Sequence, residues 1–301
     1  MMSLEHDILL ESGTNEVEIV EFSVAQNHYG INVIKVKEII MPAAVTTIPH
    51  AHPNIEGIIQ LRGEILPVVN LRKVLGHPPE TGEDDKFIVT EFNQQKIVFH
   101  VDNVSKIHRF SWDQIEKPSG MYAGTDTQVI GVVKKEDTMI LLLDFEKMIA
   151  EINPEATIRV EEVKKLGKRE RNNKRIVIAE DSGLLRELLR DTLLEAGYEQ
   201  IAFFENGKDA YEYLSGIAES GKEIKDEVQL VITDIEMPQM DGHHLTKKIK
   251  EDPALKVLPV IIFSSLITDA LRHKGEMVGA DAQISKPEIN QLILAMDEKV
   301  L

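Results

Sequence analysis

The sequence predicts a two-domain protein with an all-β first half and an α/β second half. Three observations lead there. The chain has 301 residues, which exceeds one ordinary domain and favours about two. In the first half, short stretches rich in Val, Ile and Phe recur between turn signals. In the second half, apolar strand-like runs alternate with amphipathic helical ones, which is typical of a parallel sheet.

Composition excludes several classes of protein. Hydrophobic residues make up 43% of the chain and charged residues 28%, the proportions of a soluble globular protein rather than a disordered one. Cysteine is absent, which excludes disulfides, thiolate catalysis and cysteine-ligated zinc and suits a reducing cytoplasm. The formal net charge of −17 repels phosphate backbones, so we expect no nucleic-acid partner. The acidic start, residues 1–7, does not resemble a signal peptide, and no run approaches the ~18 apolar residues of a membrane helix; we therefore expect a cytoplasmic protein with no membrane insertion.

The first half contains eight segments with strand character, which favours small barrels or a sandwich over a βαβ sheet. They are Glu18–Val24, Tyr29–Ile34, Ile58–Leu61, Ile65–Asn70, Lys86–Glu91, Lys96–Val101, Gln128–Lys134 and Met139–Asp144. Hairpin connections are expected at Asn27-His28, Arg62-Gly63-Glu64, Asn93-Gln94 and Lys135-Glu136-Asp137. Short helical turns are expected at Val33–Ile39 and Leu71–Leu75.

The second half predicts a doubly wound sheet of five parallel strands with five helices. The expected strands are Arg175–Ala179, Ile201–Phe204, Gln229–Thr233, Val260–Phe263 and Ala282–Ile284. A helix capped by Ser182 and stopped at Gly197 follows the first strand. The other helices are expected at Lys208–Ala218, His243–Glu251, Thr268–Val278 and Ile289–Lys299.

Residues 159–173 between the halves carry six basic and three acidic side chains and show almost no apolar periodicity. This composition indicates a solvated linker with a helical first half. The expected domains are therefore residues 17–158 and 174–301.

Polar side chains follow four of the five expected parallel strands. The strand ends read Ala179-Glu180-Asp181, Thr233-Asp234, Phe263-Ser264-Ser265 and Ser285-Lys286-Pro287. Ligand sites in such sheets lie at the carboxyl ends of the strands, so we expect these side chains to meet at one edge. Three crowded carboxylates repel one another unless a cation joins them, and Mg²⁺ is the natural choice for oxygen ligands. A metal with open positions beside a lysine suits a phosphoryl group.

Residues 174–301 resemble a two-component receiver domain through these strand ends and the segment Asp234-Ile-Glu-Met-Pro-Gln-Met-Asp-Gly242. The resemblance implies that Asp234 is the nucleophile that accepts phosphate from a kinase phosphohistidine. It implies that Glu180, Asp181 and the backbone carbonyl of Glu236 hold Mg²⁺ together with Asp234. It also implies that Ser264 and Lys286 bind the phosphoryl oxygens.

Two positions depart from the commonest receiver pattern. Glu180 stands where aspartate is more frequent and is one methylene longer, which tolerates a water-mediated metal contact. Gln283 occupies the place of an aromatic residue that swings inward in many receivers. Because a buried glutamine needs hydrogen-bond partners that a ring does not, we expect Gln283 to stay near the surface and switching to rely on Ser264 and residues 265–269.

Residues from about 17 to 158 resemble the CheW-like coupling domain of bacterial chemotaxis, most specifically in Ile55-Glu-Gly-Ile-Ile-Gln-Leu-Arg-Gly-Glu-Ile-Leu-Pro-Val-Val-Asn-Leu71. The resemblance implies two five-stranded barrels joined by apolar packing. It also implies a groove for the cytoplasmic tip of methyl-accepting chemoreceptors and a face for the histidine kinase CheA. Val36, Glu38, Ile39 and Arg62 match positions near those surfaces, although Val36 and Ile39 are equally well core residues and Arg62 also suits a hairpin tie.

Together the two resemblances predict a cytoplasmic adaptor, not an enzyme, that couples chemoreceptors to CheA, is recruited to receptor arrays and is regulated by phosphorylation of Asp234. An acid phosphatase or phosphomutase is an enzymatic alternative, because Asp234-Ile-Glu236 superficially matches its motif. That motif usually lies on a first strand with aspartate two residues on, whereas Asp234 follows a third strand. A transcription factor with a receiver is the third interpretation, but the acidic, strand-rich partner domain offers no basic recognition helix.

Overall fold

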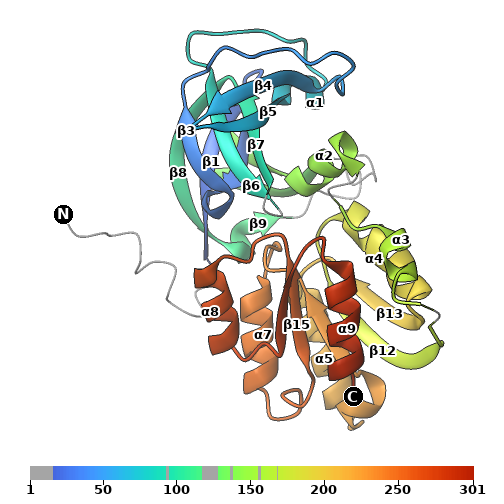
Figure 1. Ribbon diagram of the computed structural model, residues 1–301. Helices are drawn as coiled ribbons and strands as arrows, with labels where there is room; N and C mark the ends of the chain where they lie inside the picture. The colour runs from blue at the N-terminus through green and yellow to red at the C-terminus, as the bar shows by residue number, and fades with distance from the viewer. Residues whose placement is uncertain (1–15, 93–94, 117–127, 136–137, 155–156, 168) are drawn as a thin grey trace. The chain divides into compact units, whose positions relative to one another are not determined.

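We analysed a computed structural model that describes residues 16–92, 95–116, 128–135, 138–154, 157–167 and 169–301. The chain divides into two compact units, each described here by itself (Figure 1). One comprises Glu16–Phe110 and Gln114–Pro154, and the other contains the chain from residue 157 to Leu301. The expected turns at Asn93-Gln94 and Glu136-Asp137 lie outside the described residues. No helix in the described ranges has the length and apolar character needed to cross a membrane.

The first unit is built from two sheets and is rich in strands, as expected. One sheet has the order β8-β1-β2-β11-β10-β9, and the other has the order β3-β6-β7-β5-β4. The strands of the first sheet are β1 (Glu16–Val24), β2 (Asn27–Asn32), β8 (Asn103–Ser111), β9 (Ile115–Glu116), β10 (Val129–Lys135) and β11 (Thr138–Leu143). Those of the second are β3 (Val36–Ile40), β4 (Ile55–Leu61), β5 (Glu64–Asn70), β6 (Lys86–Phe92) and β7 (Gln95–Val101).

Helical segments in the first unit are short. They are the 3-10 helix η1 (Val33–Lys35) and the α-helices α1 (Leu71–Val74) and α2 (Phe145–Ile152). The 3-10 helix η2 (Trp112–Gln114) follows β8, and its residues Trp112 and Asp113 group with the second unit. The expected turn at Leu71–Leu75 is confirmed, and Asn70 caps it by accepting the Lys73 N–H at 3.0 Å. The expected turn at Val33–Ile39 is correct only for its first three residues, because Val36–Ile40 pairs with β6 as a strand. A sixth strand in the first sheet arises because the two-residue β9 pairs along β10.

Aromatic packing joins the two sheets of the first unit. Phe145, at the start of α2, contacts Phe22 of β1 with ring centroids 6.4 Å apart. The same ring contacts Phe92 of β6 at 5.9 Å and Phe99 of β7 at 4.9 Å. Large aromatic side chains bury much apolar area, so one helix residue ties both sheets into a common core. This is the shared apolar packing that the resemblance to the CheW-like domain implies.

The second unit is the predicted doubly wound α/β domain. Its sheet has the order β13-β12-β14-β15-β16, and all its neighbours are parallel. The strands are β12 (Asn172–Ala179), β13 (Tyr198–Phe204), β14 (Leu230–Thr233), β15 (Val260–Ser264) and β16 (Ala282–Ser285). The helices are α3 (Val160–Lys164), α4 (Gly183–Glu195), α5 (Gly207–Glu219), α6 (Ile224–Glu227), α7 (Gly242–Glu251), α8 (Asp269–Met277) and α9 (Ile289–Lys299).

Alternating side chains of this sheet face two separate cores. Ile176 and Ile178 of β12 pack with α4 and α9, whereas Val177 and Ala179 pack with α5 and α7. Burial on both faces explains why the strands read as continuous apolar runs rather than as alternating ones. Helices thereby cover both faces of the sheet, and polar side chains are left to its carboxyl-terminal edge.

The segment expected to be a solvated linker differs from that expectation. Its helical first half is present as α3, but Val163 is only 1% exposed and belongs to the same core as α4 and α9. Ile158 is 2% exposed in that core, and Leu166 packs against it. Ile158, Val163 and Leu166 stand among many charged residues and show no clear helical period. Composition and periodicity therefore do not indicate that one side of this segment is buried.

Candidate functional site

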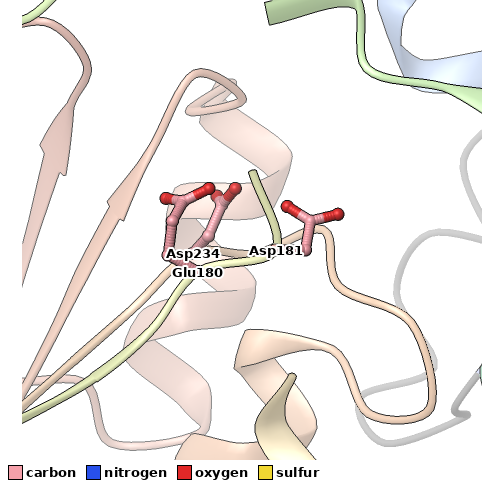
Figure 2. A group of neighbouring side chains, drawn as sticks. All are labelled: Glu180, Asp181 and Asp234. Atoms are coloured by element: carbon pink, nitrogen blue, oxygen red, sulfur yellow. The ribbon is translucent and has the colours of Figure 1, made fainter. Parts of the chain in front are cut away.

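The acidic cluster forms where the central strands of the parallel sheet end. β12 stops at Ala179 and is followed by Glu180 and Asp181, and β14 stops at Thr233 and is followed by Asp234. The two ends are aligned because the Asp234 N–H donates to the Ala179 carbonyl at 2.9 Å. One carboxylate oxygen from each of the three acids lies within 4.8 Å of the others. Figure 2 shows the three neighbouring side chains. The predicted convergence of Glu180, Asp181 and Asp234 is therefore present.

A lysine completes the cluster. Lys286 follows β16, and its Nζ lies 2.8 Å from Glu180 Oε2 and 3.1 Å from Asp234 Oδ2. All three side chains are at least 96% buried, while Asp181 is half-buried. Buried carboxylates need a counter-charge, and here one ammonium serves two of them. The arrangement presents an oxygen-rich, partly neutralised pocket, and its donor set fits a hard divalent cation such as Mg²⁺.

Arg186 binds the backbone of the loop that carries Glu180 and Asp181. This residue lies on the first turns of α4, and its Nη1 donates to the carbonyl oxygens of Glu180 and Asp181, both at 2.8 Å. Ser182 accepts the Leu185 N–H at 3.5 Å and begins the helix as predicted. The sequence alone did not indicate Arg186, because an arginine on a helix face is usually a solvated residue.

The loop after Asp234 requires glycine at position 242. A Cβ on Gly242 would lie 1.9 Å from the Asp234 carbonyl oxygen, so no other residue fits without moving the site. Asp241 caps α7 by accepting the His244 N–H at 2.7 Å. Asp241 thus caps α7, and Gly242 allows the start of α7 to pack against the backbone of Asp234.

Ser264 and Glu236 stay candidate residues by position. Ser264 is 1% exposed at the end of β15, and its carbonyl accepts the Lys286 N–H at 3.0 Å. Its Oγ accepts the Leu266 N–H at 3.2 Å. Glu236 is half-buried two residues after Asp234.

Gln283 is half-buried rather than freely exposed. Its Nε2 donates to the Arg272 carbonyl of α8 at 2.7 Å. The side-chain amide lies over Gly275, where an added Cβ would be 2.2 Å from Gln283 Oε1. The glutamine therefore attaches β16 to α8 through an ordinary hydrogen bond.

In the first unit, two of the four predicted surface residues contact each other. Arg62 Nη2 lies 2.9 Å from Glu38 Oε2, which joins the β4–β5 hairpin to β3. Arg62 has φ of 50° and Gly63 has φ of 90°, the left-handed values that a two-residue hairpin turn requires. Ile39 is 40% exposed beside them, and Val36 is half-buried. An open groove of about 790 Å³ lies elsewhere on this unit; its lining includes Ile55, Ile65, Pro67, Ile97, Ile149 and Ile152.

A buried histidine cluster in the first unit was not predicted. His100 Nδ1 lies 2.9 Å from Glu56 Oε1, and its Nε2 lies 3.0 Å from Asp85 Oδ2. Burial alone would lower the pKa of His100, but the hydrogen bonds and charges of Glu56 and Asp85 outweigh it and raise the pKa above its ordinary value. The imidazole bridges β7, β4 and the segment before β6.

Comparisons with known proteins agree with both units. The model of the CheW-like domain matches residues 18–153, and that of the response regulator receiver domain matches residues 176–297. The chain is 29% identical to the chemotaxis protein CheV3 of Helicobacter pylori over 90% of this chain and 91% of that protein. It is 32% identical to the chemotaxis protein CheW of Bacillus subtilis over 44% of this chain and 86% of that protein.

The scaffolding protein TtCheW of Thermoanaerobacter tengcongensis is a similar solved structure, with 35% identity, a TM-score of 0.39 and coverage of 42% of this chain and 88% of that one. The order of the two matched domains is the same as the order of the two units in the fold. The chain therefore belongs to the CheV family of chemotaxis proteins, adaptors in which a CheW-like coupling domain precedes a phosphorylatable receiver domain.

Proposed function

We propose that Asp234 accepts a phosphoryl group from the phosphohistidine of CheA. The observation that carries the proposal is the position of its carboxylate, buried at the end of the central strand with Lys286 Nζ 3.1 Å away. In the transfer, an oxygen of Asp234 forms a bond to phosphorus while the N–P bond of the phosphohistidine breaks. The bonding electrons stay on the imidazole nitrogen. Hydrolysis of the aspartyl phosphate by water would then restore the carboxylate.

The neighbouring residues have separate tasks. Asp181, Glu180, Asp234 and the Glu236 carbonyl would hold Mg²⁺, which when bound supplies positive charge to the transferring phosphoryl oxygens. Glu180 already accepts the Ser182 N–H at 3.2 Å and the Lys286 ammonium at 2.8 Å. Both its oxygens are occupied, which favours a water-mediated rather than a direct metal contact. Lys286 and Ser264 would hold the phosphoryl oxygens, and their backbones are already joined at 3.0 Å.

We propose further that the CheW-like unit binds the tips of chemoreceptors and CheA, and that binding recruits the chain to receptor arrays. The open apolar groove fits a helical receptor tip, because an amphipathic helix buries its apolar face in such a groove. The Arg62–Glu38 pair and the exposed Ile39 fit a mixed polar and apolar contact with the kinase. Within this proposal the receiver tunes an adaptor and does not act as a separate enzyme.

The phosphotransfer proposal is tested by incubating the full-length protein with labelled phospho-CheA and Mg²⁺. We expect the wild type to take up label and Asp234→Asn to take up none, because the amide keeps the shape but is not a nucleophile. Asp191→Asn changes an exposed aspartate on α4 and serves as the matched control. Stable label on the Asp234→Asn variant at another carboxylate would contradict the assignment.

The coupling proposal is tested by co-sedimentation with receptor-containing membranes and CheA. We expect Arg62→Glu to weaken CheA binding by about tenfold, because the reversed charge faces Glu38 and disrupts that surface. Arg109→Glu, at another exposed arginine of the same unit, is the control. Equal loss in both variants would show a general charge effect and not a specific surface.

A further inference from the structure

The segment that follows the CheW-like unit is built into the receiver. Ile158, Val163 and Leu166 pack into the core formed by the sheet, α4 and α9. Figure 1 shows α3 beside α4, and α3 also contacts α9. On α4 the core residues are Leu185, Leu189 and Leu193, and on α9 they are Leu292, Ile293 and Met296. The α4–α9 face is therefore covered by the chain's own connecting segment, defined here as residues 157–167.

Polar contacts anchor the chain beyond this segment to the same two helices. Arg169 Nε donates to the Ala196 carbonyl, at the end of α4, at 2.9 Å. Its guanidinium also pairs with Asp297 of α9, which accepts the Tyr198 hydroxyl at 2.7 Å. One arginine thus ties the end of α4 to α9. Docking of the connecting segment depends on the relative position of these two helices.

Both helices begin at the acidic pocket. α4 starts at Gly183, two residues after Asp181, and α9 starts at Ile289, three residues after Lys286. Arg186 fixes the start of α4 to the carbonyls of Glu180 and Asp181. Helices move as stiff bodies, so a shift of the Asp181 loop relative to Lys286 changes the spacing of α4 and α9.

We infer that docking of the connecting segment on α4 and α9 is coupled to the acidic pocket. Phosphorylation of Asp234 would then change how tightly residues 157–167 dock on these two helices. The inference rests on the proposed phosphorylation of Asp234. Lys286 is at present shared by Glu180 and Asp234, and a phosphoryl group on Asp234 competes for that ammonium. The altered contact of Lys286 supplies the differential interaction that a switch between two states needs. The CheW-like unit ends at Pro154, and this segment begins three positions later in the sequence, at residue 157.

The first test is amide hydrogen exchange of residues 157–167 in the full-length protein. It compares the metal-free state, Mg²⁺ alone, and Mg²⁺ with acetyl phosphate as the phosphoryl donor. We expect phosphorylation to change exchange in this segment by about fivefold, and the same treatment to leave Asp234→Asn unchanged. Intact mass measured on the same samples reports whether a phosphoryl group was added.

These two measurements separate the possible failures. If a phosphoryl group is added but hydrogen exchange in residues 157–167 does not change, the inferred coupling is wrong while the proposed function stands. If the wild type gains no phosphoryl group, the proposed function is wrong, and the inferred coupling fails with it.

The second test uses reciprocity, because two coupled equilibria must affect each other equally. Val163→Ser weakens docking at a buried position, and Lys164→Ser introduces the same residue at the exposed neighbour. We expect Val163→Ser to shift the Mg²⁺ concentration for half-maximal phosphorylation by about fivefold and Lys164→Ser to leave it unchanged. Arg169→Gln removes the second anchor without touching the core and should shift the same midpoint in the same direction. If both Val163→Ser and Arg169→Gln keep the wild-type Mg²⁺ concentration for half-maximal phosphorylation, the inferred coupling is wrong.

Discussion

The ammonium of Lys286 lies 2.8 Å from Glu180 Oε2 although the two residues are 106 positions apart in the sequence. The same ammonium lies 3.1 Å from Asp234, so one cation holds two buried carboxylates together. The ground state of the pocket is thus an ion-pair network that Mg²⁺ or a phosphoryl group must rearrange.

Removing the lysine should destabilise the metal-free receiver. We expect Lys286→Ala to lower its free energy of unfolding by about 3 kcal/mol, because two buried carboxylates lose their counter-charge, and Mg²⁺ to restore part of the loss. Urea unfolding with and without Mg²⁺ measures both effects. Lys299→Ala, at a more exposed lysine that pairs with Glu298, is the control and should leave stability nearly unchanged. Unchanged stability of Lys286→Ala in the absence of metal would argue against the network.

The same variant should also separate receipt of phosphate from response to it. Lys286→Ala keeps Asp234 and the acidic residues, so we expect slow but measurable labelling by phospho-CheA. The phosphorylation-dependent change in receptor and kinase binding should be lost, because the cation that contacts the phosphoryl group is gone. Titration of receptor–CheA complexes with phosphorylated variant and wild type measures this. A wild-type change in binding would exclude the role assigned to Lys286.

Gly275 and Gln283 should show strong non-additivity. Replacing a helical glycine by alanine is normally stabilising by about 1 kcal/mol. Here the new methyl would displace the Gln283 amide and break its bond to the Arg272 carbonyl, so we expect Gly275→Ala to be nearly neutral. In a Gln283→Ala background the same change should stabilise by about 1 kcal/mol. A double-mutant cycle of urea midpoints checks this, and full additivity would contradict it.

The histidine cluster gives the CheW-like unit a pH-dependent stability. The pKa of His100 is raised above its ordinary 6.5. The protonated imidazole therefore adds its full contribution to the free energy of unfolding below pH 6.5, and this contribution is lost as pH rises through the folded-state pKa. The pKa of Glu56 is held below its ordinary 4.5, against the effect of burial, by His100, Asn70 and Lys73. Its contribution is therefore present above pH 4.5 and is lost as pH falls through the lowered pKa.

We expect the stability difference between wild type and His100→Gln to be greatest between pH 4.5 and 6.5 and to shrink on both sides. The His100 ring is packed against Phe87 and faces Glu56 and Asp85, with Asn70 hydrogen-bonded to the same Glu56 oxygen. Urea unfolding at a series of pH values measures the difference, with His77→Gln as the control. A difference that keeps growing above pH 6.5 would contradict the sign.

Fragments should reveal where the receiver begins. We expect a fragment of residues 157–301 to be more stable than one of residues 174–301 by about 3 kcal/mol, because the shorter fragment lacks the buried side chains of Ile158 and Val163. Conversely, a CheW-like fragment ending at residue 158 should gain nothing over one ending at Pro154. Equal thermal midpoints for the two receiver fragments would show that the segment is dispensable.

The local pattern of the sequence determined the receiver almost completely. Its strands follow each other at regular intervals with helices between them, and parallel strands place all their carboxyl ends on one edge. That rule alone predicted that Glu180, Asp181, Asp234 and Lys286 meet. In the first unit the same reasoning found eight strand segments but missed β3, β8, β9 and α2. It assigned β3 to a helical turn, and the two residues of β9 are too few to show a period.

Only the tertiary structure decided the pairings and the contacts between distant residues. β2 pairs with β11 in parallel, which joins His28 to Ile140, and no local periodicity encodes such a partner. Val163 looked solvated because its neighbours are charged, yet it is buried since the opposite surface, on α4 and α9, is apolar. Burial depends on which surface a side chain meets after folding, whereas periodicity reports only the residue's own neighbours along the chain.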